Sequence, residues 1–302
     1  MTLRIAGAGL AGLLCAHAWP QATVFDPAPG PRAAHRAVLR FRTEGVASLT
    51  GIEFRPVQVR KGLWYDGAFT TPDVRLANFY SSKVLGGQVA SDRSVWKLDP
   101  VQRFIAPETF YEQLVEAVGA RIRWGEACNY HGPDAAIVVS TAPMPSLLKL
   151  LGIGLEHPEQ LFLRQPIKVV RLRVKRCDVF QTVYFPDPEV PVYRASITSD
   201  LLIVEGVREI EQTDIAQVCE AFGIGDVELI DSGEQRFGKI VPLPDGLRRA
   251  TLHRLTTEYG IFSIGRFATW RNVLLDDVVQ DIAAVRRLMR AGQYERRMFA
   301  AR

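Results

Sequence analysis

The chain has 302 residues, of which 47% are hydrophobic and 23% are charged, and 37 Lys and Arg against 33 Asp and Glu give a net charge of +4. These values are ordinary for a globular protein and exclude a disordered tail, a collagen-like repeat and a small disulfide scaffold. Because no run of 18 apolar residues occurs, no transmembrane helix is expected. The length favours one large domain or two interleaved domains.

Arginine dominates the basic residues, since only seven of the 37 are Lys. Arginine suits clamps on phosphate or carboxylate groups, but a GC-rich genome produces the same bias. The four cysteines are scattered without a CxxC pair or a His/Cys cluster, so no metal site is predicted. The N-terminus lacks the features of a signal peptide, which makes a reducing cytoplasm the expected location.

The first 26 residues follow the order of a dinucleotide-binding unit. An apolar strand is predicted over 3–6, the motif GAGLAG occupies 7–12, an apolar helix is predicted over 13–19, and a strand over 22–25 ends at Asp26. Pro20 ends the helix. This order predicts that a dinucleotide binds where the first strand meets the first helix.

Each residue type in this motif has a physical role. Gly7 permits the tight turn, Gly9 lets the backbone approach a pyrophosphate, and Gly12 lets the helix pack on the strand. The helix start, with Ala8, Leu10 and Ala11, presents N–H groups and the positive end of the dipole to the phosphates. The Asp26 carboxylate would accept hydrogen bonds from the ribose hydroxyls of the dinucleotide. Only 13 residues separate Gly12 from Asp26, which predicts a helix about one turn shorter than usual.

Two further segments are expected beside this unit. Residues 27–45 form a predicted loop that carries His35, Arg36, Arg40 and Arg42, either to contact the cofactor or as a solvated basic loop. A helix is predicted after Pro107, ending at Gly119, with strands at 121–124 and 135–139. Thr141 and Ala142 follow the last of these strands, so they would present backbone to a ligand at the carboxyl edge of the sheet.

The region from 160 to 255 changes to alternating strands, as 46–97 does in part. Strands are predicted at 54–59, 62–65, 170–175, 179–185, 191–197, 201–205 and 236–241, with a helix over 211–222. On 170–175 Arg171, Arg173 and Lys175 alternate with apolar residues. That basic face would meet either solvent or a polyanion. A buried strand at 260–264 and a helix from Asp276 to about 291 close the chain.

Three segments together resemble a known family. GAGLAG with VFD, the middle IVVSTAP, and the C-terminal SIGRFATWRNVLLDDVVQD look like flavoproteins of the glutathione-reductase structural class, nearest to the amine-oxidase and UDP-galactopyranose-mutase branch. The resemblance implies that FAD is the cofactor. It also implies that Gly265, Arg266 and Asp277 contact the flavin pyrophosphate and ribityl chain. A NAD-dependent dehydrogenase would leave the C-terminal segment without a role.

The expected fold class is α/β: a Rossmann-like FAD-binding domain with an inserted β-rich (α+β) substrate domain. Residues 1–45, 98–152 and 256–302 are assigned to the FAD-binding domain, and 46–97 and 153–255 to the substrate domain. The chain is compact, as are bacteriophage flavoenzymes of this kind. One such group acts in thymidine hypermodification, where it breaks a C–N bond in an amino acid attached to the base.

The first functional hypothesis is an FAD-dependent oxidoreductase or lyase that acts on an amine or amino-acid C–N bond, free or on a modified thymidine in phage DNA. Lys239 would contact the flavin, or else be a surface lysine. Arg194 would bind a substrate carboxylate or phosphate, and Tyr193 would form a pocket wall. The alternatives are a non-redox mutase on a sugar nucleotide, which would use Arg194 and Arg254, and a flavin-binding protein without turnover. The expected partner is a small-molecule amine or a modified nucleotide, with DNA left open and no membrane.

Overall fold

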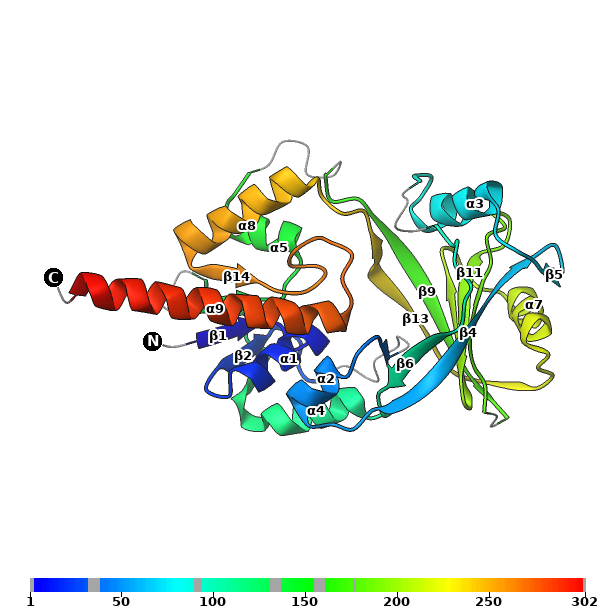
Figure 1. Cartoon of the computed structure of the whole chain (residues 1–302), viewed down its shortest axis with the longest axis horizontal. Coiled ribbons are helices and arrows are strands. Elements are labelled where there is room, and N and C mark those ends of the chain that lie inside the picture. Colours follow the sequence, from blue (N-terminus) through cyan, green and yellow to red (C-terminus); the bar gives the residue numbers. More distant parts are fainter. Residues whose placement is uncertain are drawn as a thin grey trace.

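The computed structural model describes residues 3–31, 39–89, 94–130, 137–154, 161–175 and 178–300, with side chains up to residue 292. Two sheets dominate the fold (Figure 1). A five-stranded sheet lies among helices at the left of the view, and a nine-stranded sheet curls at the right. The chain passes between the two several times, so neither half is continuous in sequence.

The smaller sheet is entirely parallel, in the order β14-β8-β1-β2-β7. Its strands are β1 (Leu3–Ala6), β2 (Thr23–Asp26), β7 (Ile122–Trp124), β8 (Ile137–Ser140) and β14 (Ile261–Ser263). β1 is central and its residues are mostly buried, as expected for a strand covered on both faces. The expected strands of the dinucleotide-binding unit are thereby confirmed.

Helices cover both faces of this sheet. On one face lie α1 (Leu10–Ala18), α2 (Gly45–Thr50), α4 (Phe110–Val118) and α9 (Leu275–Ala300), which share one hydrophobic core. On the other lie α5 (Met144–Leu150) and α8 (Asp245–Tyr259), packed in a second core. The structure therefore has the three-layer arrangement of a Rossmann-like domain.

The larger sheet is mixed, in the order β13-β9-β12-β11-β10-β4-β6-β3, with β5 paired to β4. β10 and β4 run parallel and the other pairs are antiparallel. Its strands are β3 (Arg40–Phe41), β4 (Arg55–Tyr65), β5 (Ala68–Phe69), β6 (Val101–Ile105), β9 (Arg164–Val174), β10 (Phe180–Tyr184), β11 (Val192–Thr198), β12 (Leu201–Gly206) and β13 (Val227–Ile240).

A helix packs on each face of the larger sheet. α7 (Gln212–Phe222) covers the face that carries Leu172, Ala195 and Val204, while α3 (Val74–Val84) packs against the opposite face, which is called the inner face below. The structure thus has two sheets, each packed against its own helices. β3 and β6, from segments assigned to the FAD-binding domain, pair in the larger sheet, and α8, from a segment assigned to the substrate domain, contacts β14.

The basic face of β9 is the inner face, and its central arginine is not solvated. Arg171 is only 4% exposed and pairs with Glu108, which lies just before α4, and with Asp231 on β13. Arg173 pairs with Asp200 at 2.8 Å. The prediction that the basic face of this strand is exposed to solvent is therefore wrong for Arg171. Because its charge is already compensated inside the chain, Arg171 itself is not available to a polyanion, and the polyanion alternative for the rest of this face stays a prediction.

None of the helices in the described part of the chain combines the length and the apolar character needed to span a bilayer. Within the same residues no three His, Cys, Asp or Glu side chains gather in a way that could hold a metal ion.

Candidate functional site

The glycine turn between β1 and α1 has two glycines that the fold itself requires. Gly7 has φ +101°, and a Cβ there would lie 2.5 Å from Thr141 Oγ1. A Cβ on Gly12 would lie 1.8 Å from the carbonyl oxygen of Gly7. These distances are far shorter than van der Waals contact distances, so neither position can carry a side chain in this backbone arrangement. The packing roles that the sequence predicts for these two glycines match this geometry.

Gly9 differs, because nothing in the described protein requires a glycine there. Its φ is −74°, and a Cβ would meet no atom within 4 Å. The residue caps α1, whose first internal hydrogen bond runs from Leu13 N–H to the Gly9 carbonyl at 2.9 Å. The N–H groups of Leu10, Ala11 and Gly12 precede that bond and point toward the N-terminal end of the helix. This cradle fits the pyrophosphate of a dinucleotide.

Asp26 ends β2 and is 6% exposed. Its Oδ2 accepts the Ala8 N–H at 2.7 Å and its Oδ1 accepts the Ala28 N–H at 2.9 Å. The carboxylate therefore holds the glycine turn from the neighbouring strand, a role that the sequence did not suggest. Each oxygen keeps a lone pair, so a contact with a ribose hydroxyl stays a prediction.

The middle and C-terminal segments meet this turn at the carboxyl edge of the sheet. Thr141 donates its hydroxyl to the Ala6 carbonyl at 2.8 Å, directly before Gly7. Ala142 follows it in the link to α5. Gly265 has φ +92°, and a Cβ there would lie 3.1 Å from the Ala11 Cβ. Three segments that are far apart in sequence are thus brought together, as open α/β sheets require for a ligand at this edge.

The acids at the start of α9 hold the segment after β3. Asp276 is 5% exposed and accepts the N–H groups of Arg42 and Thr43, the latter at 2.9 Å. Asp277 accepts the Leu274 N–H at 2.8 Å and forms an ion pair with Arg42. The predicted cofactor contact of Asp277 stays a prediction. Arg36 and His35 lie outside the described residues.

Lys239 is buried rather than a surface lysine, so that alternative is wrong. It is 6% exposed, and its Nζ lies 4.6 Å from the centre of the Tyr193 ring. It follows an irregular stretch of β13, where Gly238 approaches Ile167 so closely that a Cβ would lie 2.4 Å away. This irregularity shifts the register by two residues and places Lys239 opposite Gln165, on the inner face.

Glu205 on β12 joins the three residues that the sequence singled out for catalysis. A bulge in β11 places both Tyr193 and Arg194 within reach of it. The Tyr193 hydroxyl donates to Glu205 Oε1 at 2.9 Å, and Arg194 Nε donates to Oε2. Burial raises the pKa of Glu205, but Arg194 and Lys239 outweigh that effect and hold the pKa below its ordinary value.

Glu205 was not predicted from the sequence, although a single acid at the end of the apolar run LLIVEG indicates a charged partner. Burial, followed by the neighbouring Glu205 carboxylate, holds the pKa of the Tyr193 hydroxyl well above its ordinary value. Tyr193 is therefore a neutral hydrogen-bond donor at neutral pH. We call Tyr193, Arg194, Glu205 and Lys239 the polar cluster.

The polar cluster is connected to the glycine turn through the C-terminal segment. Arg266 Nη2 donates to the Gly238 carbonyl at 3.2 Å, next to Lys239, while the adjacent Gly265 touches α1. Lys239 also lines a pocket of about 140 Å³ with Leu85, Gly86, Gln88, Leu163, Arg164, Gln165 and Val241. The predicted catalytic residues and the predicted cofactor turn are thus joined by one short chain of contacts.

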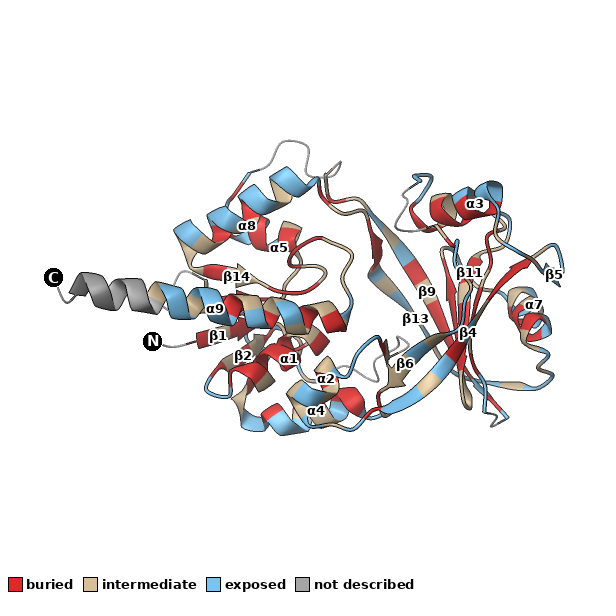
Figure 2. Ribbon diagram, in the orientation of Figure 1, coloured by how far each residue is buried: buried red, intermediate tan, exposed pale blue. Residues whose placement is uncertain are grey.

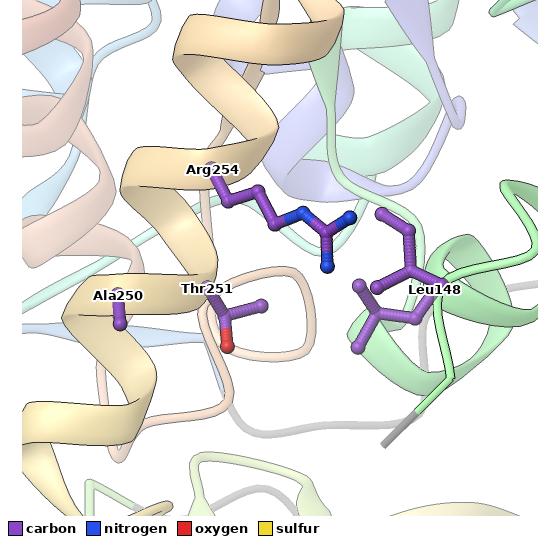
Figure 3. A pocket seen from close by; sticks show the side chains of 5 residues that line it. Leu148, Ala250, Thr251 and Arg254 are labelled. Atoms are coloured by element: carbon purple, nitrogen blue, oxygen red, sulfur yellow. The ribbon is translucent and has the colours of Figure 1, made fainter.

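A second pocket, of about 150 Å³, lies between α5 and α8 and is lined by Leu148, Ile153, Ala250, Thr251 and Arg254 (Figure 3). Arg254 pairs with Glu258 on its own helix at 2.9 Å. α8 and β11 lie in opposite halves of the molecule (Figure 1). The structure therefore does not bring Arg254 and Arg194 together as a diphosphate clamp.

Comparison with known proteins gives a fold but no close relative. No protein-family model matches the chain, and no curated protein matches it. A candidate protoporphyrinogen oxidase from Exiguobacterium sp. 255-15 superposes with a TM-score of 0.58 at 12% identity, over 94% of this chain and 97% of that one. An oxidoreductase from Methanosarcina mazei gives 0.58 at 12% identity, over 95% and 100%.

A lanthipeptide tryptophan 5-halogenase superposes with a TM-score of 0.52 at 13% identity, over 94% of this chain and 65% of that one. Each likeness spans both sheets of this chain, because each covers more than nine-tenths of its length. The chain therefore shares the fold of these three proteins, in which a Rossmann-like parallel sheet is joined to a curled mixed sheet.

Proposed function

We propose that the protein is an FAD-dependent oxidoreductase that acts on an amine or amino-acid C–N bond. The observation that carries this proposal is the contact chain from Gly265 through Arg266 and Gly238 to Lys239, which joins the glycine turn to the polar cluster. When bound, the flavin would supply the electron acceptor for the substrate. Leu10, Ala11 and Gly12 would hold its pyrophosphate through their N–H groups.

The residues of the polar cluster have distinct tasks in this proposal. Lys239 brings a positive charge and N–H donors, and the Tyr193 ring orients its ammonium group. Glu205 places its negative charge beside both Lys239 and Arg194, which offsets the cost of burying these cations. Because Arg194 is still 32% exposed, its remaining N–H groups are available to an anionic group on the substrate. An amine that arrives neutral needs no separate base.

Replacing Lys239 with Met is expected to lower the rate of substrate reduction of the flavin by about 100-fold, with FAD retained. Met keeps the length and the apolar stem but removes the charge. The measurement is anaerobic bleaching of the flavin absorbance by candidate amines. Lys175→Met, at an exposed position after β9, is the matched control and should react like the wild type.

Equal reduction rates in Lys239→Met and the wild type would remove Lys239 from the chemistry. A flavin spectrum that no amine bleaches would overturn the C–N assignment. Action on a modified thymidine in DNA rests on the family resemblance, and an amino-acid-modified oligonucleotide in the same assay tests it. The mutase alternative required Arg194 and Arg254 to bind one diphosphate together. Arg254 is on α8, in the other half of the molecule from Arg194 on β11, so this pair does not form.

A further inference from the structure

Among the basic side chains on the inner face of the larger sheet, four come from four different strands away from β9 and β13. They are Arg40 on β3, Lys61 on β4, Arg103 on β6 and Arg194 on β11, and we call them the cation face. The register places them on one face. Lys61 is opposite Thr182, which is opposite Ser196, two residues from Arg194. Arg40 is opposite Ile105, two residues from Arg103, and Arg103 is opposite Val57 on the same strand as Lys61. Partners in register lie on one face, as do residues two apart on a strand.

Arg40 crosses the hollow of the curled sheet to reach strands that are not its neighbours. Its Nη1 donates to Thr182 Oγ1 at 3.0 Å and its Nε to Thr198 Oγ1 at 3.0 Å. Its Nη2 donates to the Ile197 carbonyl. All of these acceptors are neutral, so they orient the guanidinium without balancing its charge.

The charge on this face is only partly compensated. Arg194 is paired with Glu205, and Asp99 acts on Lys61. Among the residues that the structure describes, no carboxylate forms an ion pair with Arg40 or Arg103. Burial, then Arg194 and Arg103, lowers the pKa of Arg40 to about 10. The groups that repel Arg40 are thus its own neighbours on the cation face.

Positive charges that lie together with little compensation favour an anion between them. We propose that the cation face binds a phosphate monoester group of the substrate, a proposal that rests on the proposed oxidoreductase function and names its substrate class. A phosphate monoester carries a charge of about −1.5 to −2 at neutral pH. That charge matches Arg40 and Arg103, whereas a carboxylate would balance only one of them. The hydroxyls of Thr182 and Thr198 lie against the Arg40 guanidinium group, and the Ser196 hydroxyl is hydrogen-bonded to that of Thr182.

The test is calorimetric titration of the FAD-saturated protein with inorganic phosphate and with glycerol 3-phosphate at low ionic strength. Lys61→Gln and Arg103→Gln are the informative variants, because neither side chain bonds another strand's side chain in the described structure. Each should raise the dissociation constant for phosphate about tenfold. Arg60→Gln is the matched control: it removes the same charge one residue away, from an exposed side chain on the opposite face.

The expected result is that Arg60→Gln changes the phosphate affinity by less than about twofold, because a screened surface charge contributes little. If Arg60→Gln and Lys61→Gln lose the same phosphate affinity, the loss comes from the change in net charge alone, and the proposed site is overturned. Acetate that binds as tightly as phosphate would overturn the phosphate assignment.

A loss of FAD affinity in Lys61→Gln would assign the cation face to the cofactor and overturn the substrate site. A protein that binds no FAD would contradict the proposed function, yet the phosphate titration can still be read on the FAD-free chain. Failure of the anion site and failure of the oxidoreductase proposal are therefore separate results.

Discussion

Gly9→Leu is expected to lower the affinity for FAD by about 100-fold while the protein folds normally. The backbone at Gly9 has φ −74°, which any residue adopts, and a Cβ there would meet no protein atom within 4 Å. A larger side chain therefore costs the fold little. It would fill the space in front of the α1 N–H groups, where the pyrophosphate is predicted to bind.

Gly12→Ala separates this effect from damage to the fold. Its Cβ would lie 1.8 Å from the Gly7 carbonyl oxygen, so α1 would have to move away from β1. We expect a loss of about 3 kcal/mol in the free energy of unfolding for Gly12→Ala. FAD titration followed by absorbance, together with denaturant unfolding, distinguishes the two variants. Normal FAD retention in Gly9→Leu would remove the cofactor assignment of the turn.

Glu205→Ala is expected to lower the free energy of unfolding by about 3–5 kcal/mol, because it removes the buried carboxylate whose negative charge acts on both Arg194 and Lys239. The Tyr193 hydroxyl would also lose its acceptor. Denaturant unfolding measures the change. Glu209→Ala is the control, since Glu209 is 77% exposed and its ion pair with Lys168 is a surface pair worth about 1 kcal/mol or less.

The contribution of Glu205 also has a defined pH dependence. Its pKa in the folded state is lowered, so the unfolded chain binds its proton more readily. The stabilisation is therefore present above the ordinary carboxyl pKa of 4.5 and is lost as pH falls through the lowered folded value. The gap in stability between wild type and Glu205→Gln should narrow as the solution is acidified from neutral pH. A gap that stays constant with pH would show that Glu205 is not ionised in the folded protein.

The dinucleotide-binding unit could be predicted because its signals are local. The order of strand, glycine turn, helix and strand follows from residues 3–26 alone, and β1, α1 and β2 confirm it. The apolar stripe after Pro107 likewise predicts α4, whose buried residues are Phe110, Tyr111, Leu114 and Val118. α7 is confirmed over 212–222, where a capping box and Gly223 mark its two ends.

Elements without such signals were missed. α8 buries only Thr251 and Leu255, so its sequence carries no apolar stripe, and Figure 2 shows most of its surface exposed. α3 begins at a capping residue, Asp73, that accepts the Leu76 N–H at 2.7 Å, but its short amphipathic pattern lies in a region of mixed signals. β13 runs from 227 to 240, far beyond the predicted 236–241, because its edge position leaves many of its residues exposed.

The sequence by itself determined the α/β class, the order of the cofactor-binding unit and the residue types at its turn, because these depend on spacing and on backbone conformation within a few residues. The tertiary structure decided which charges meet. Lys239, Glu205 and Arg194 lie on three strands, and only the sheet order and two strand irregularities bring them together. The same holds for Arg171, whose charge is paired with Glu108 from a segment 63 positions away along the chain. Side-chain electrostatics acts through space, so its partners are set by packing rather than by position along the chain.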